Sequence, residues 1–200
     1  AGIACLSRFM VEQDIQDGRF IALLEDQIQI KEQKIHAVYY QQNYVPKRIR
    51  LFIDFLVEKL KEYGVEVTYH SLSLDDHEMT TSKINEALKQ GVDIVLCTGG
   101  MSVDPDDRTP LAIKNTGANI ISYGSPVLPG AMFLLAYKGE VPIVGLPGCV
   151  MYAKRTVFDL VLCRLLAKDV VTYEELCDLG EGGLCLGCDI CTYPNCGFGK

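Results

Sequence analysis

Residues 92–98, with the sequence VDIVLCT, constrain the fold of this chain more than any other segment. A short, continuous apolar run is typical of a strand that is buried on both faces, as in parallel sheets covered by helices. Two glycines follow directly, and glycine allows a tight turn and close backbone approach of a ligand. The run therefore predicts the central strand of an α/β domain.

Segments of strand and helix character alternate on both sides of this run. β-rich runs predict strands at residues 34–40, 65–72 and 118–124, and a hairpin at 131–145. Apolar residues at helical spacing predict helices at residues 46–63, 73–90, 109–115 and 151–166. This alternation predicts an α/β fold, a three-layer sandwich with a mostly parallel central sheet.

The ends of the chain differ from its middle. We expect a strand and helix extension over residues 1–34, the α/β domain over 35–180, and a small irregular Cys-rich tail over 181–200. The chain begins without Met or a secretory leader, so we expect the C-terminal piece of a longer protein that lacks an N-terminal partner domain. We also expect a homo-oligomer.

Charge and hydropathy exclude two classes of partner. The formal net charge is −7, whereas a nucleic-acid-binding domain needs a basic face. No apolar stretch reaches the length of a membrane span. The negative charge does not exclude an anionic small ligand, because a few backbone amides can hold one phosphate.

Nine cysteines are many for 200 residues, and four of them fall in the last sixteen. The odd total and the tight cluster argue against a secreted disulfide scaffold and favour reduced thiols in the cytoplasm. The tail spacing predicts metal ligation, by a 4Fe–4S cluster or by Zn²⁺, with no metal or a disulfide as the alternative. The predicted metal ligands are Cys185, Cys188, Cys191 and Cys196.

The loop after residues 92–98 carries the densest polar chemistry of the chain. Gly99 and Gly100, together with Ser102, can form an anion-binding concavity. Three carboxylates follow within four residues, and close carboxylates bind Mg²⁺ beside substrate phosphates. The alternative is purely structural: the glycines make the turn and the Asp residues cap the next helix.

This loop, TGGMSVDPDDRTP, resembles the signature of the molybdopterin-binding fold. That fold is shared by molybdopterin adenylyltransferases and molybdopterin molybdenumtransferases. Pro129-Gly130 and the later GLPG segment are spaced as in the molybdenumtransferases, and Leu74-Asp75-Asp76 resembles an acidic loop of the adenylyltransferases. The PDD segment also resembles the competence- and damage-inducible family, which has the same fold and includes nucleotide pyrophosphatases.

The resemblance implies molybdopterin as ligand or substrate, with Mg²⁺ as a further cofactor, and it implies roles for particular residues. The residues implied to hold the pterin or its phosphate are Thr98, Gly99, Gly100, Met101, Ser102, Pro147, Gly148 and Cys149. The residues implied to align the reacting phosphate are Asp75, Asp104, Asp106 and Asp107. Because parallel strands end at one edge of a sheet, we expect residues 98–107 and 146–149 to line one cleft.

Departures from these families leave the activity open. Residues 39–43, YYQQN, lack the Gly and Glu usual after the first strand, and GLPGCV lacks the second Pro. The hypotheses are adenylyl transfer or metal insertion in molybdenum-cofactor biosynthesis, a non-catalytic carrier or sensor, and a nucleotide pyrophosphatase. Cys149 adds an alternative of its own, since a thiol at a helix N-terminus has a lowered pKa and can be nucleophilic.

Overall fold

The structure is a computed structural model of the chain and describes residues 15–19, 21, 33–40, 54, 57, 65–73, 76–102, 104 and 107–200. The predicted extension over residues 1–34 and the helix predicted at 46–63 lie mostly outside the described residues. None of the helices in the described part of the chain has the length and apolar character of a membrane span.

Six strands form one sheet, in the order β2-β1-β3-β6-β5-β4. The strands are β1 (Gln33–Tyr40), β2 (Val65–Ser73), β3 (Ile94–Thr98), β4 (Asn119–Tyr123), β5 (Leu134–Lys138) and β6 (Val141–Leu146). The first four in spatial order are parallel, whereas β5 runs antiparallel to β6 and β4 antiparallel to β5. The prediction of a mostly parallel sheet with a hairpin is confirmed.

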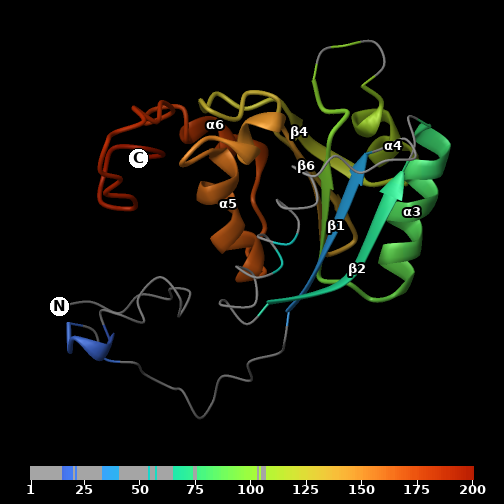
Figure 1. Ribbon diagram of the computed structural model, residues 1–200, viewed down its shortest axis with the longest axis horizontal. Coiled ribbons are helices and arrows are strands. Elements are labelled where there is room, and N and C mark those ends of the chain that lie inside the picture. Colours follow the sequence, from blue (N-terminus) through green and yellow to red (C-terminus); the bar gives the residue numbers. More distant parts are fainter. Residues whose placement is uncertain are drawn as a thin grey trace.

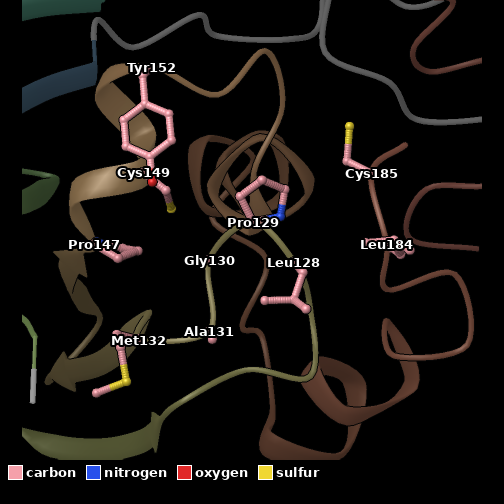
Figure 2. Close-up of a pocket in the computed structure, with 10 residues that line it drawn as sticks. All are labelled: Leu128, Pro129, Gly130, Ala131, Met132, Pro147, Cys149, Tyr152, Leu184 and Cys185. Carbon is pink, nitrogen blue, oxygen red and sulfur yellow. The ribbon is translucent and has the colours of Figure 1, made fainter. Parts of the chain in front are cut away.

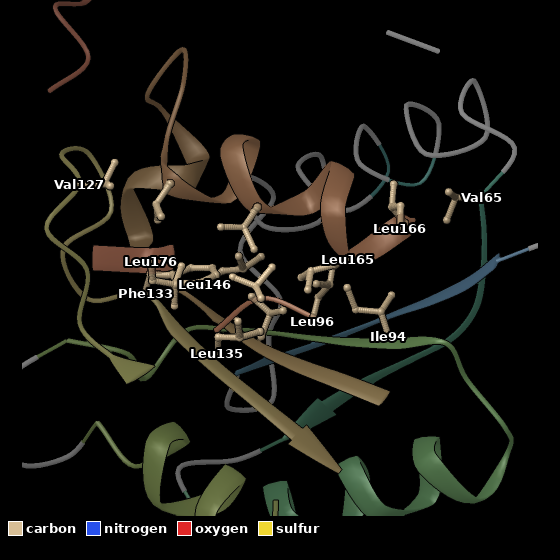
Figure 3. Close-up of a cluster of buried hydrophobic side chains, with 14 of the residues drawn as sticks. Val65, Ile94, Leu96, Val127, Phe133, Leu135, Leu146, Leu165, Leu166 and Leu176 are labelled. Atoms are coloured by element: carbon tan, nitrogen blue, oxygen red, sulfur yellow. The ribbon is translucent and has the colours of Figure 1, made fainter. Parts of the chain in front are cut away.

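Helices cover both faces of the sheet and complete the predicted three layers (Figure 1). One face carries α3 (His77–Lys89) and α4 (Thr109–Asn115), and the other carries α5 (Val157–Leu166) and α6 (Tyr173–Asp178). Strand β3 lies between β1 and β6, and its side chains alternate between the two cores. Ile94 and Leu96 pack toward α5, and Val95 and Cys97 pack toward α3. Figure 3 shows the core on the α5 side.

The helix predicted at residues 151–166 begins later than its apolar pattern indicates. A 3₁₀ helix, η2 (Gly148–Met151), precedes it, and α5 starts only after Thr156. The Thr156 hydroxyl accepts a hydrogen bond from the N–H of Phe158, while Asp159 accepts one from the N–H of Thr156. This capping box fixes the helix start, because it satisfies donors that a helix end leaves unpaired.

Candidate functional site

Two strand-to-helix loops begin side by side at the carboxyl edge of the sheet. Thr98, the last residue of β3, pairs in register with Leu146, the last residue of β6. In open α/β sheets, ligands bind outside this edge, in the loops that follow the strands. The register therefore sets the starts of the loops after β3 and β6 side by side.

The first loop turns sharply at two glycines in the left-handed region, with φ of +85° at Gly99 and +60° at Gly100. Thr109, at the start of α4, holds both: its hydroxyl donates to the carbonyl of Gly99 at 2.8 Å and its N–H to that of Gly100 at 3.1 Å. A Cβ atom on Gly100 would lie 2.7 Å from the Thr109 hydroxyl oxygen. Only glycine fits this turn without displacing α4.

Asp107 organises the rest of the loop. Its carboxylate accepts a hydrogen bond from the N–H of Ser102 at 2.7 Å, and its own N–H donates to the carbonyl of Asp104 at 2.9 Å. The hydroxyl of Tyr123 donates to the carbonyl of Ser102 at 3.3 Å, and burial, followed by the Asp107 charge, raises the pKa of Tyr123. Asp104 and Asp107 are thus close together, while Asp75 and Asp106 lie outside the described residues.

Met101 does not present its side chain to a ligand. It is 3% exposed and packs in the core beside Gly145, where an added Cβ would lie 2.4 Å from the methionine methyl carbon. The side chain therefore anchors the loop to the sheet, and any contact of Met101 with a ligand would be made by its backbone.

A pocket of about 430 Å³ lies at the second loop (Figure 2). Its lining is mostly apolar, and it comes from three segments that are far apart in the sequence. The lining residues are Leu128, Pro129, Gly130, Ala131, Met132, Pro147, Cys149, Tyr152, Leu184 and Cys185. Of the predicted ligand-binding residues, Pro147 and Cys149 are here, but residues 98–102 are not among the lining. The expected common cleft is therefore two adjacent parts, a glycine turn and a pocket.

The structure does not support the alternative in which Cys149 is an activated thiol. It lies in η2 rather than at the N-terminus of α5, and burial raises the pKa of its thiol, against a smaller opposing effect of its own backbone N–H. A raised pKa leaves little thiolate at neutral pH, and the thiolate is the nucleophile. The structure therefore supports a lining role for Cys149.

The four tail cysteines do not form the predicted metal centre in this structure. Within the described residues, which include the whole tail, no three His, Cys, Asp or Glu side chains gather where they would hold a metal ion. Cys188 and Cys191 are exposed, whereas Cys185 and Cys196 pack against the core on the α5 side. This arrangement supports neither a cluster nor Zn²⁺, because either needs its thiolates to converge on one point. Of the four Asp residues predicted to align the phosphate, the structure describes Asp104 and Asp107, and these two likewise give no support to Mg²⁺.

Comparison with known protein families identifies the family to which this chain belongs. The model of a family described as "Probable molybdopterin binding domain" matches residues 52–168, more than half of the chain. The chain belongs to this family. Molybdopterin is therefore the ligand that its family membership supports, in the setting of molybdenum-cofactor biosynthesis.

Individual relatives match shorter stretches. A molybdopterin molybdenumtransferase from Synechococcus elongatus is 31% identical over 86 residues, which is 43% of this chain and 21% of that protein. The N-terminal part has a different likeness. The LysR substrate binding domain model matches residues 1–61, and the transcriptional regulator CrgA from Neisseria meningitidis is 51% identical over 59 residues. The chain spans about a fifth of the length of both relatives.

Solved structures share the fold. The crystal structure of molybdenum cofactor biosynthesis protein B matches with a TM-score of 0.53 and 21% identity, over 69% of this chain and 96% of that one. The CinA protein from Thermoplasma acidophilum matches with a TM-score of 0.53 and 15% identity, over 67% of this chain and 98% of that one. At such identities, the likeness shows the fold alone and does not select one activity.

Proposed function

We propose that this chain binds molybdopterin at the carboxyl edge of its sheet, with the pterin ring in the pocket and the phosphate at the glycine turn. The pairing of Thr98 with Leu146 carries this proposal, because it sets the two loops side by side. A ligand with a flat ring and an anionic end needs two adjacent subsites of different character. Family membership supplies the ligand, and the loops supply the two subsites.

The pocket suits the ring. Its volume of about 430 Å³ falls in the range of roughly 300–1,000 Å³ that is common for small-molecule sites, which are mostly apolar with few polar groups. Successive backbone N–H groups in a turn with left-handed residues form a concavity that favours anions. The turn at Gly99 and Gly100 supports this role for a phosphate, with Ser102 beside it.

Binding without turnover is the form of the function that we favour. The carboxylate of Asp107, which the family resemblance implies to be catalytic, already accepts a hydrogen bond from the N–H of Ser102. This contact gives Asp107 a role in shaping the loop that requires no chemistry on the substrate. A carrier or sensor of the cofactor needs only such a preformed site.

The test is anaerobic titration with molybdopterin, followed by pterin fluorescence, with and without ATP and Mg²⁺. We expect saturable binding and unchanged ATP. Adenylylated pterin would instead identify a transferase, and release of adenylate from a free dinucleotide would identify a pyrophosphatase. No binding under any condition would overturn the proposal.

A matched pair of variants ties the binding to this pocket. Ala131 lines the pocket and Ala167 follows α5 outside its lining, yet both side chains are exposed. Ala131→Phe fills the space proposed for the ring, so we expect at least a tenfold loss of affinity, whereas Ala167→Phe leaves the affinity unchanged. Equal affinities of the two variants would show that the pterin binds elsewhere.

A further inference from the structure

The C-terminal tail, residues 181–200, folds back onto the domain beside α5 (Figure 1). Near its start, Leu184 forms an isolated parallel β-bridge with Leu128. The N–H of Leu128 donates to the carbonyl of Gly183 at 2.6 Å, and the N–H of Cys185 donates to the carbonyl of Leu128 at 2.8 Å. A Cβ atom on Gly183 would lie 2.4 Å from the carbonyl oxygen of Pro126. The tail therefore packs against the loop at residues 126–132, which forms one side of the pocket.

The distal part of the tail is anchored to α5. Phe198 is 5% exposed and belongs to the core on that side. The hydroxyl of Tyr193 donates to the carbonyl of Asp159 at 3.1 Å, and the guanidinium of Arg155 lies 4.7 Å from the centre of the Tyr193 ring. The N–H of Gly199 donates to the carbonyl of Gly182, which closes the tail on itself. These contacts fix the tail at both ends.

Because it is fixed, the tail contributes a wall to the pocket. Leu184 and Cys185 line the side opposite Pro147 and Cys149 (Figure 2). The side chain of Leu184 is 59% exposed, so it still has apolar surface that a ligand would cover. The family match ends at residue 168, so this wall comes from outside the matched segment.

We propose that the tail is a specificity element of the pterin site, with Leu184 as the residue that packs against the bound ring. The inference rests on the proposed function. It assigns the tail a task that its fold can perform without metal: to supply one wall of the pocket. Burial of apolar surface between Leu184 and the ring would supply affinity.

The tail offers a matched control for Leu184. Leu186 lies two residues further on and is 79% exposed, but it is not among the pocket lining. We expect Leu184→Ala to lower the affinity for molybdopterin about tenfold, since single apolar contacts in such pockets give effects of this order. Leu186→Ala should bind like the wild type. Neither substitution should change the melting temperature, because both side chains are exposed.

A second pair of variants tests the position of the tail instead of the Leu184 side chain. Gly183→Ala forces the tail away from Pro126, whereas Gly197→Ala adds a Cβ that meets no atom within 4 Å. We expect Gly183→Ala to weaken pterin binding and to speed the alkylation of Cys149 by a small maleimide, located by mass spectrometry. Gly197→Ala should change neither quantity.

The two readouts separate this inference from the proposed function. If the wild type binds molybdopterin and Leu184→Ala and Gly183→Ala bind equally well, the inference is overturned while the proposed function stands. If the wild type binds no pterin, the proposed function fails and the inference fails with it. Faster alkylation of Cys149 in Gly183→Ala than in Gly197→Ala would then show only that the tail forms a wall of the pocket.

Discussion

The N–H of Ser102 donates to the carboxylate of Asp107 across 2.7 Å, and this contact joins the two ends of the loop that follows β3. Together with the bonds from Thr109 to the carbonyls of Gly99 and Gly100, it closes the loop over the edge of the sheet. The acidic residue that sequence patterns associate with chemistry thus also shapes the backbone of this loop.

Removing this carboxylate should loosen the loop. Hydrogen bonds to charged groups contribute roughly 1.5–3 kcal/mol when buried, and this one is exposed, so we expect Asp107→Ala to cost about 1 kcal/mol of unfolding free energy. Pterin affinity should fall about tenfold. Asp107→Asn keeps an acceptor oxygen and should retain most of the stability. Urea denaturation and fluorescence titration measure the two quantities, and a stability loss as large in Asn as in Ala would contradict the loop role.

The sequence predicts strand β3 well because a local pattern determines it. The run at residues 92–98 has no polar face, and β3 lies inside the sheet with its side chains divided between two cores. The pocket wall formed by Leu184 depends on a contact with Leu128 across more than fifty residues. Neither residue type nor spacing signals such a pairing, so the sequence indicates a metal-binding tail and gives no sign of a pocket wall.

The start of α5 allows a comparison of two capping boxes. Thr156 is 2% exposed, whereas Thr172, which caps α6 with Glu175, is exposed. Loss of an N-cap costs about 0.5–2 kcal/mol, with the larger values where the donors cannot reach water. We therefore expect Thr156→Ala to cost about 2 kcal/mol and Thr172→Ala about 0.5 kcal/mol in urea denaturation. Equal costs would show that burial does not set the value of these caps.

Both helices also show what sequence reasoning missed. The pattern Thr-x-x-Asp at Thr156 and Thr-x-x-Glu at Thr172 is a sequence signature of a helix start. Apolar periodicity alone extends α5 back to residue 151, across a 3₁₀ turn that happens to continue the apolar pattern. It overlooks α6, since six residues are too few to show a period. The capping residues carried the missing information.

The buried thiol of Cys97 makes stability depend on alkaline pH. Burial raises its pKa from 9.0 to about 12. The unfolded chain therefore releases this proton first as the pH rises, so the contribution of Cys97 to stability is complete below about pH 9 and is lost toward pH 12. In this window one proton corresponds to a slope of about 1.4 kcal/mol per pH unit.

The pH dependence of the unfolding free energy in two cysteine variants tests the contribution of the Cys97 thiol. Cys97→Ala should flatten the decline of unfolding free energy with pH by up to that slope, whatever its effect at neutral pH. Cys188→Ala, which changes an exposed thiol, should leave the slope unchanged. Urea denaturation at pH 8, 9, 10 and 11 gives the values, and parallel curves for all three proteins would contradict the prediction.

Substitutions of Phe198 and Cys188 distinguish two interactions that could hold the tail in place, apolar packing and metal ligation. Phe198 is buried in the core on the α5 side, whereas the thiol of Cys188 is exposed. Truncation of a buried Phe costs about 3–5 kcal/mol where the site cannot relax, and detachment of the tail limits the cost here to about 2–3 kcal/mol. We expect Phe198→Ala to lower the melting temperature and to speed hydrogen exchange over residues 181–200, and Cys188→Ser to do neither.

Metal analysis of anaerobically purified protein should find no stoichiometric iron or zinc. One equivalent of either metal that is lost in Cys188→Ser, together with a loosened tail, would show instead that thiolate ligation holds the tail.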